Sequence, residues 1–506
     1  MEYAEPDAQS EKNKKPIRRV IIAGGGTAGW STAAAISKVL GKILDITLIE
    51  SDEIVTVGVG EATIPAMVAF HNLLEINENE FMAAVQGTFK LAISFEGWRN
   101  VDENYYHAFG HTGKDHWSAG FQHFWHKGRE RKLAADFSEY CLELKAGDAG
   151  RFAHLPNHGL NYAYHLDAGL YAKYLRKMSE SFGVKRLEGK IQKVETDPVS
   201  GDITSLRLES GVNLEADLFI DCTGFRALLI GDALKVGYKD WSNWLFCNRA
   251  IAAQTEAVRD PVPYTRAIAH EAGWQWRIAL QRKVGNGLVY SSRYMEEEQA
   301  RKIFLSTIEG ALVQEPRLIK YTPGQREQTW KGNCVAIGLS SGFLEPVEST
   351  SIYMIQRSVL RLMQMFPTNG ICKTDVAEFN KQSNYEVEHI RDFIILHYHM
   401  TNRRDSAFWR DANSMEIPAA LQHRIDLFRE TGRVFRAPNE LFAESSWIQV
   451  MLGQGIMPEQ HHQSADLMGD KELSQFLDGI RNTIAQTVKQ LPTHQAYVQR
   501  YCPASK

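Results

Sequence analysis

The pattern of apolar and polar residues near the N-terminus predicts the start of a parallel sheet. From Ile17, the run RRVIIAG is typical of a buried strand, GGGTAGW of a glycine-rich turn and STAAAISKVLG of a helix of small residues. A second apolar run, DITLIE, ends in Glu50. A strand, a helix and a further strand in this order are typical of a doubly wound α/β fold.

The pattern changes further along the chain. The middle part predicts short strands and turns, as in SLRLES, ADLFIDCTG and CVAIGL. From about Thr350, apolar residues recur at helical spacing in IYMIQRSVLRLMQMF, YEVEHIRDFIILHY and DKELSQFLDGIRNTIAQTVKQL. We therefore predict a nucleotide-binding module over residues 17–350 and a mainly helical region over 351–506. We expect residues 1–16 to be a disordered tail, and about 100–150 an insertion packed on the helices.

The glycine-rich turn predicts a dinucleotide site. Gly24 permits a tight turn, Gly26 lets the backbone approach a pyrophosphate, and Gly29 allows close packing of helix on strand. Glu50 ends the second strand, where an acid typically binds ribose hydroxyls. The alternative is a glycine-rich turn without a ligand, but the strand, loop, helix, strand and acid together favour binding.

Two later strands that end in glycine turns indicate which dinucleotide is bound. LFIDCTGF and CVAIGLSSGFLEP suit FAD, which is bound along an extended length, better than NAD, although each alone is typical of an ordinary strand end. The predicted module is thus Rossmann-like, of the glutathione-reductase type. Its expected cofactor-binding residues are Gly24, Gly26, Thr27, Ala28, Gly29, Glu50, Asp221, Gly224 and Gly338.

Composition narrows the possible partners. The formal net charge of -4 does not indicate a nucleic-acid or anionic-membrane partner. The six cysteines form no CxxC pair, and no window approaches the ~18 apolar residues that a membrane span needs. We expect a cytoplasmic enzyme with reduced thiols.

Several longer motifs carry a specific resemblance. GVGEATIP, TFKLAISFEGW, YHLDAGLYAKYL and FLEPVEST resemble motifs of the flavin-dependent tryptophan halogenases. GWQWRI resembles most of that family's W-x-W-x-I-P motif, with Ala279 in place of the proline. Together with FILHYHMTNRRDSAFW, these matches extend over nearly the whole chain.

The resemblance implies a defined chemistry. Reduced FAD, supplied by a separate flavin reductase, and dioxygen would oxidise chloride or bromide to hypohalous acid. The acid would travel through a tunnel to a lysine beside an electron-rich, indole-type ring. By match to the family motifs, the lysine is Lys90 and the paired acid is Glu348.

The residue types agree with this chemistry. A lysine desolvated in an apolar stretch such as FKLAISF can have a lowered pKa and hold an electrophilic halogen, as a hydrogen-bonded acid or a haloamine. A carboxylate can orient that species or take the ring proton. Without the resemblance, Lys90 is more typical of a solvated strand edge, and Glu348 of an acid at a helix N-terminus.

The remaining candidate residues flank these two. At the predicted helix start, the amides of Thr350 and Ser351 can bind a halide, although many family members have glycine in place of Ser351. Trp274 and Trp276 share one face of a strand and are either core aromatics or, as the resemblance implies, a barrier between flavin and substrate. We assign Ser349 and Trp447 to the same boundary.

We expect no metal site. His123, His126, His461 and His462 raise the possibility, but no carboxylate and histidine set with ligand spacing is evident, so surface or core histidines are the better interpretation.

Two alternative functions remain open, a flavin-dependent aromatic monooxygenase and an inactive FAD-binding protein. We also expect a small aromatic substrate other than free tryptophan, because SWIQVMLGQGIMPEQ offers no tyrosine for binding an amino acid. A homodimer is possible.

Overall fold

The six-stranded sheet at the N-terminal end has the predicted doubly wound topology. The structure, a computed structural model, describes residues 15–54, 60–116, 119–155 and 159–504, so most of the expected tail and two residues of GVGEATIP lie outside it. Four neighbouring pairs of strands are parallel, and the edge strand β20 is antiparallel. In spatial order the strands are β20 (Trp330–Lys331), β21 (Cys334–Ala336), β12 (Leu218–Asp221), β1 (Arg19–Ala23), β2 (Asp45–Glu50) and β8 (Lys185–Glu188).

Three helices pack around this sheet. α1 (Gly26–Leu40) contacts both α6 (Ala168–Ser181) and α8 (Ser351–Gln364). The predicted strands β1 and β2 are confirmed, but α1 starts at Gly26 and not after the glycine turn as expected. Gly26 and Gly29 therefore lie in the first turn of the helix, and Gly24 and Gly25 immediately precede it.

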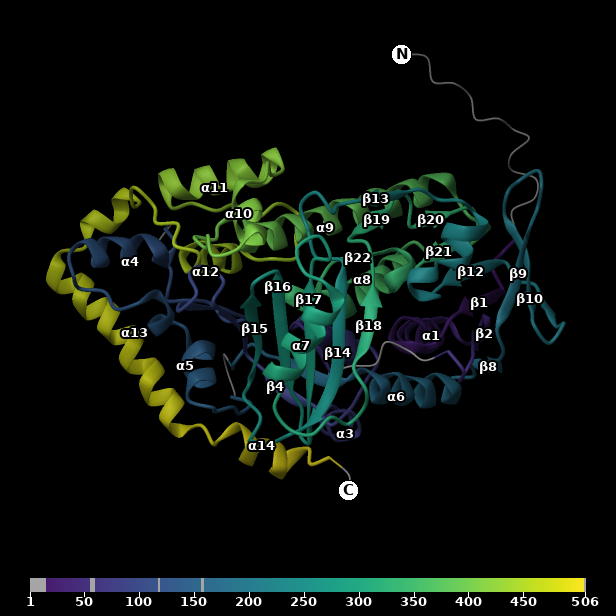
Figure 1. Cartoon of the computed structure of the whole chain (residues 1–506), viewed down its shortest axis with the longest axis horizontal. Coiled ribbons are helices and arrows are strands. Elements are labelled where there is room, and N and C mark those ends of the chain that lie inside the picture. Colours follow the sequence, from purple (N-terminus) through teal and green to yellow (C-terminus); the bar gives the residue numbers. More distant parts are fainter. Residues whose placement is uncertain (1–14, 55–59, 117–118, 156–158, 505–506) are drawn as a thin grey trace, which may run out of the picture.

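A seven-stranded, mostly antiparallel sheet forms the centre of the molecule (Figure 1). Its only parallel pair among the described residues is β5 with β15, so strands from distant parts of the chain meet next to the edge strand β6. In spatial order the strands are β18 (Arg317–Lys320), β14 (Arg249–Glu256), β17 (Lys283–Tyr290), β16 (Gly273–Ala279), β15 (Tyr264–His270), β5 (Ala92–Glu96) and β6 (Asn104–Ala108).

Three small sheets complete the β structure. The first packs against the seven-stranded sheet and contains β3 (Gly60–Ala62), β7 (Ala163–Asp167) and β4 (Thr88–Lys90). The second projects at the edge of the molecule (Figure 1) and contains β9 (Ile191–Thr196), β10 (Ile203–Leu208) and β11 (Asn213–Leu214). The third contains β13 (Tyr238–Asp240), β19 (Gly324–Arg326) and β22 (Gly342–Phe343).

The C-terminal part is helical, as predicted. In the described residues after β22, every element is a helix or a helical turn. The helix predicted from YEVEHIRDFIILHY is much longer, because α9 begins at Lys373. The helices after α8 are α9 (Lys373–His399), α10 (Ala407–Ser414), α11 (Ala419–Thr431), α12 (Glu444–Gly453), α13 (Asp470–Gln490) and α14 (His494–Tyr501). Elsewhere the helices are α2 (Ala66–Leu73), α3 (Glu78–Ala84), α4 (Phe121–Glu130), α5 (Leu142–Asp148) and α7 (Glu297–Thr307).

One apolar core crosses the predicted boundary at residue 350. Trp274 and Leu288 of the central sheet belong to the same buried cluster as Phe393 and Trp447 of the C-terminal helices. The 100–150 segment likewise contributes to a cluster with α13, in which Phe121 and Phe124 pack with Leu473 and Leu477. The helices therefore complete the core of the central sheet.

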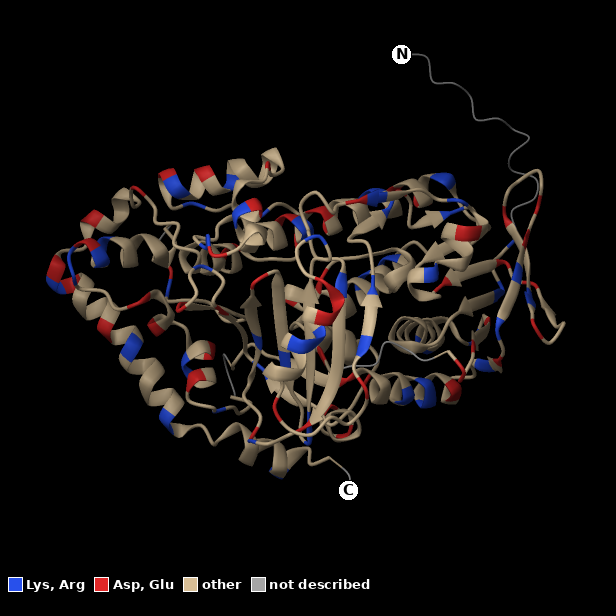
Figure 2. Ribbon diagram, viewed as in Figure 1, with Lys and Arg blue, Asp and Glu red and all other residues tan. Residues whose placement is uncertain are grey.

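The surface carries both signs of charge. Both basic and acidic residues lie along the outer helices α6, α11 and α13 (Figure 2). Within the described residues, no helix has the length and apolar character required to cross a membrane.

Candidate active site

The glycine turn brings backbone amides and one carboxylate together. Gly24 has a φ of +100°, and a Cβ there would lie 2.3 Å from the carbonyl oxygen of Cys222. A Cβ on Gly25 would lie 1.7 Å from Glu50 Oε2, so the Glu50 carboxylate lies directly against the loop. A Cβ on Gly29 would lie 2.0 Å from the carbonyl oxygen of Gly24. Each clash explains why the turn needs glycine at these positions.

This turn forms one end of a large cavity of about 510 Å³. α1 has no acidic side chain in its first turn, so its amides and dipole remain available for an anion. Glu50 is held by Arg186 Nε at 2.7 Å and Trp30 Nε1 at 3.2 Å. The lining residues that concern the predictions are Gly24, Gly26, Thr27, Ala28, Glu50, Gly224, Trp276, Ser349 and Ser351. The cavity suits an extended dinucleotide whose phosphates lie at the N-terminus of α1.

Three predicted cofactor residues do not line this cavity. The Asp221 carboxylate is buried and accepts hydrogen bonds from the amides of Thr223, Leu229 and Ile230. It therefore stabilises the turn after β12. Gly338 packs against α1, where a Cβ would lie 2.8 Å from that of Ala28, and Gly29 packs beneath Gly24.

Lys90 lies at the end of β4 and is completely buried, which excludes a solvated strand edge. Its Nζ donates hydrogen bonds to Ser349 Oγ at 2.8 Å and to the carbonyl oxygen of Thr63 at 3.0 Å. The ring of Phe109 lies 4.9 Å from Nζ. Burial lowers the pKa of Lys90 from 10.5 to about 7, against the opposing attraction of Glu348. The amine thus exchanges a proton near neutral pH.

Glu348 is buried between two histidines. It ends a short helical turn, Pro346–Glu348, before α8. His107 Nδ1 forms a hydrogen bond with Oε2 at 2.7 Å, and His397 Nε2 lies 2.7 Å from Oε1, outside good hydrogen-bond geometry. Burial alone would raise the pKa of Glu348, but the charge and hydrogen bond of His107, together with the close approach of the His397 ring, outweigh it and hold the pKa at about 2. Glu348 is therefore a buried anion and not an acid at a helix N-terminus.

Further polar groups hold His397 in place. Tyr105 OH lies 2.7 Å from His397 Nδ1, and Gln454 Nε2 donates both to Tyr105 OH and to the carbonyl oxygen of His397. Burial lowers the pKa of His397, with Glu348 opposing the change. These contacts, at the Nδ1 atom and at the carbonyl oxygen of His397, orient the other ring nitrogen toward Glu348.

Residues 349–351 lie between the cavity and the buried lysine. Ser349 adopts a left-handed conformation with a φ of +58°, lines the cavity and accepts the hydrogen bond from Lys90. α8 starts at Ser351, as predicted. Thr350 is fully buried, and its Oγ1 has no hydrogen-bond partner among the described residues. An unpaired buried hydroxyl beside free helix amides is suited to an anion.

The two predicted barrier tryptophans have different positions. Trp276 lines the cavity, and its indole covers Gly287, where a Cβ would lie 2.0 Å from the ring. Trp274 does not line the cavity, contrary to its assigned role. Its Nε1 donates to Glu345 Oε2 at 2.7 Å. The ring centroids of the two tryptophans are 6.0 Å apart, so Trp274 supports Trp276 from the core.

Trp447 belongs to a buried aromatic cluster that packs against His107, the hydrogen-bond partner of Glu348. Its ring meets Phe393 edge to face with centroids 4.7 Å apart, and Phe393 stacks on Phe442 at 3.8 Å. The ring of His107 lies 5.5 Å from Phe393. The cluster places aromatic faces next to the buried carboxylate.

Sequence reasoning missed several members of this site. His107 lies on β6 and His397 on α9, and their contribution depends on packing between distant segments. Their sequence context, two histidines within aromatic runs, carries only a weak signal. Burial also raises the pKa of two overlooked acids, Glu61 at the cavity wall and Glu345 beside Trp274, to about 7 each.

Comparisons with known proteins identify the family of this chain. The tryptophan halogenase family model matches residues 19–470. The tryptophan 7-halogenase RebH of Lentzea aerocolonigenes is 34% identical over 482 residues, which cover 88% of this chain and 90% of the relative.

Solved structures also match along almost their full length. The flavin-dependent halogenase Xcc4156 from Xanthomonas campestris is 62% identical with a TM-score of 0.96, over 97% of this chain and 99% of the other. BrvH, a flavin-dependent halogenase from Brevundimonas sp. BAL3, is 41% identical with a TM-score of 0.92, and the match covers 96% of this chain and 99% of the BrvH chain. The resemblance found in the sequence motifs is thus confirmed. The chain belongs to the tryptophan halogenase family and is a flavoprotein enzyme of the flavin-dependent halogenase class.

Proposed function

We propose that this protein uses reduced FAD, dioxygen and chloride or bromide to halogenate an electron-rich, indole-type ring, and that Lys90 delivers the halogen. The observation that carries the proposal is the position of Lys90. It is fully buried, hydrogen-bonded to Ser349 at the edge of the cavity, and electrostatically coupled to Glu348.

The residues around the cavity fit FAD. The α1 amides would hold the pyrophosphate, Glu50 the ribose hydroxyls, and Trp276 with Ser349 would lie at the end nearer Lys90. When bound, reduced FAD supplies the two electrons with which dioxygen and a halide ion give hypohalous acid and water. A separate flavin reductase would provide the reduced cofactor.

The start of α8 supports a halide site. Thr350 Oγ1 is buried without a partner, and α8 has no acidic residue in its first turn. We infer that the Thr350 hydroxyl and the amides of residues 350 and 351 bind the halide next to the cavity. Ser351 itself lines the cavity, so the bound ion would be accessible from it.

Lys90 would then hold the oxidised halogen. With a pKa of about 7, Lys90 is available at neutral pH both as an ammonium, which donates a hydrogen bond to hypohalous acid, and as an amine, which can accept the halogen. In either case the halogen bonds to a ring carbon as its bond to oxygen or to the lysine nitrogen breaks. The electron pair of that bond stays on oxygen, which leaves as hydroxide or water, or on the nitrogen, which becomes the free amine again, and the ring then loses a proton. Glu348 can accept that proton because the strongly acidic cationic ring intermediate protonates even a carboxylate with a pKa of about 2.

The aromatic cluster supports an indole-type substrate. His107 contacts Glu348, and its ring packs on Phe393, which in turn meets Trp447, so the surroundings of the carboxylate are aromatic. The segment 446–460 contributes no tyrosine, so we expect poor binding of the ammonium and carboxylate of free tryptophan. The relative RebH is a tryptophan halogenase, and the difference proposed here concerns this segment.

The test uses the full chain with FAD, a flavin reductase, NADH, dioxygen and halide. We expect halogenated indole from the wild type and loss of more than about 100-fold in Lys90→Ala, with FAD affinity and peroxide release retained. Lys471→Ala, at an exposed position of α13, is the matched control and should keep full activity.

Three outcomes would contradict the proposal. Hydroxylated products alone, over a panel of aromatic compounds with both halides, would favour an aromatic monooxygenase. FAD binding without any halide consumption would favour an inactive binding protein. Regiospecific halogenation by a folded Lys90→Ala variant would exclude the role of the lysine.

A further inference from the structure

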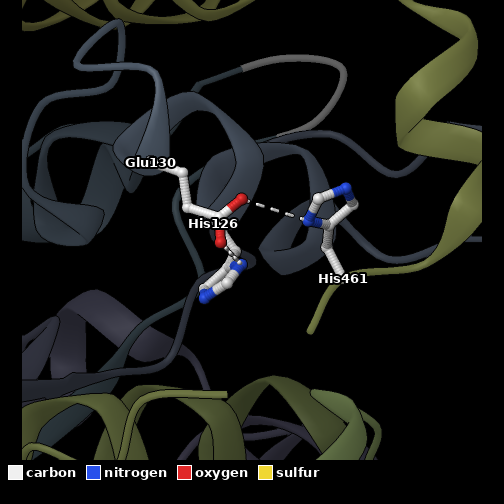
Figure 3. A group of neighbouring side chains, drawn as sticks. All are labelled: His126, Glu130 and His461. Carbon is white, nitrogen blue, oxygen red and sulfur yellow. Dashed lines mark ion pairs between the residues drawn. The ribbon is translucent and has the colours of Figure 1, made fainter. Parts of the chain in front are cut away.

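Three potential metal ligands lie together at the outer side of the molecule, away from the flavin cavity. His126 and Glu130 are four residues apart on α4, which puts them on one face of the helix. His461 comes from the segment between α12 and the short turn Gln463–Leu467. One ligand atom from each of these residues lies within 4.8 Å of the others (Figure 3).

The carboxylate of Glu130 lies between the two imidazoles. Oε2 is 3.4 Å from His461 Nδ1, and Oε1 is 4.0 Å from His126 Nδ1 (Figure 3). A tetrahedral zinc ion with its usual bond lengths separates neighbouring ligand atoms by about 3.3 Å. The first distance already fits this value, and the second requires a shift of less than about 1 Å by the half-exposed Glu130.

Each imidazole uses its other nitrogen elsewhere. His461 Nε2 lies 2.9 Å from Asp466 Oδ1, and the carbonyl group of Pro458 is a hydrogen-bond partner of the His126 ring. When those nitrogens carry the protons, both Nδ1 lone pairs face Glu130. An imidazole oriented by a second acceptor is the usual arrangement of a histidine metal ligand.

His126 supplies an independent observation. Its side chain is 9% exposed, and its Nδ1 has no hydrogen-bond partner among the described residues. A buried ring nitrogen without a partner is costly unless something else binds it. If Glu130 were only a surface acceptor for two histidines, this nitrogen would be expected within hydrogen-bond distance of the carboxylate.

The surrounding charges permit a divalent cation. Glu130 and Asp466 contribute two negative charges, against Lys127 and Arg129 on the same helix. Lys127 Nζ donates to the carbonyl oxygens of Ala465 and Met468, which fixes its ammonium on the side of Asp466. The Lys127 ammonium is thus committed to these oxygens.

We propose that His126, Glu130 and His461 bind one zinc ion, with water as the fourth ligand. Two imidazoles and one carboxylate favour zinc over magnesium or calcium, which prefer oxygen ligands. The expectation of no metal site is revised, because Glu130 follows His126 by one helical turn and the fold adds His461. The inference is independent of the proposed function.

The ion would bind α4 and the segment after α12 to each other, close to the proposed substrate site. α4 belongs to the 100–150 segment, and His461 follows α12, which carries Trp447 and contacts β6. Gln449 of α12 also hydrogen-bonds the backbone of residues 108 and 110, next to His107. Zinc would hold the segment after α12 against α4 and thereby stabilise the position of α12. We assign it no role in the chemical step.

The experiment is a titration of Zn²⁺ into full-length, FAD-loaded protein after chelator treatment, with a competing chromophoric chelator. We expect one equivalent to bind, and its affinity to fall at least about 10-fold in His126→Ala, His461→Ala and Glu130→Gln. The control is His423→Ala, which removes an exposed histidine on α11. Bound Zn²⁺ should raise the melting temperature of the wild type and the control only.

Substitution with Co²⁺ tests the geometry, since a tetrahedral N₂O₂ site gives stronger visible absorption than an octahedral one. Two results would overturn the proposal: Zn²⁺ binding to wild type no tighter than to the three ligand variants, or weak binding of several equivalents that His423→Ala reduces equally. If the metal-free ligand variants melt at the same temperature as the metal-free wild type and control, misfolding is excluded as the cause of lost affinity.

Discussion

Replacing Lys90 by methionine should stabilise the fold below neutral pH, although it removes the proposed halogen carrier. Burial lowers the pKa of Lys90 from 10.5 to about 7, so folding costs free energy whenever the free chain would carry the proton. At 1.36 kcal/mol per pKa unit, the full cost is about 5 kcal/mol below neutral pH. Methionine fills a similar volume without charge, and it loses two hydrogen bonds worth about 1 kcal/mol each.

The sign of the pH dependence follows from proton binding. Between the folded and unfolded pKa values of Lys90, the unfolded chain binds more protons than the folded one, so wild-type stability rises with pH relative to the variant. The stability advantage of Lys90→Met should therefore shrink by about 3 kcal/mol between about pH 6.5 and about pH 9.5. The exposed Lys471→Met on α13 should show no such change.

Denaturant unfolding of wild type, Lys90→Met and Lys471→Met at a series of pH values measures this difference. A stability gap for Lys90→Met that stays constant over the range would mean that the buried amine keeps an ordinary pKa. It would also refute the argument that a neutral amine is available near pH 7.

Three other results are expected. Glu348→Gln should lower turnover by about 10- to 1000-fold without loss of FAD affinity. Because the pKa of Glu348 is about 2, turnover should not fall with its protonation near pH 5, and a decrease in wild-type turnover there that is absent from this variant would contradict a buried anion at this position. Gly287→Ala should displace the Trp276 indole and destabilise the protein by about 1–3 kcal/mol, whereas Gly479→Ala, with open space around it, should not. Indole should exceed L-tryptophan in kcat/KM at equal halide concentration, and a tryptophan advantage of about 10-fold or more would show that segment 446–460 was misinterpreted.

The parts of the site that local sequence determines could be predicted. Gly24, Gly26 and Glu50 belong to one segment of strand, turn, helix and strand about thirty residues long. In such a segment the spacing of the residues alone indicates that the acid lies close to the glycine turn. Lys90 and Glu348 were identified only through longer motifs, because an isolated lysine or glutamate is more often solvated. The structure supplies the physical reason for the motifs, since both side chains are fully buried and coupled in charge.

The errors and omissions come from tertiary packing. Asp221 has the sequence position of a ligand-binding acid, but its carboxylate is saturated by amides of the next turn. Trp274 and Trp276 were correctly placed on one face of a strand, yet only Trp276 reaches the cavity. The histidines around Glu348 come from β6 and α9, nearly three hundred residues apart, and no local pattern reports such a pairing.

The apolar core that spans residue 350 limits how new specificities can be engineered. A chimera that joins the first 350 residues of this chain to the helical region of a relative would replace a large part of one close-packed interior, including residues that share the buried cluster of Trp274 and Leu288. We expect such hybrids to misfold even when the relative has the same topology. The region around α12 is a better unit of exchange, because it can be redesigned residue by residue while β16, β17 and α9 are left intact.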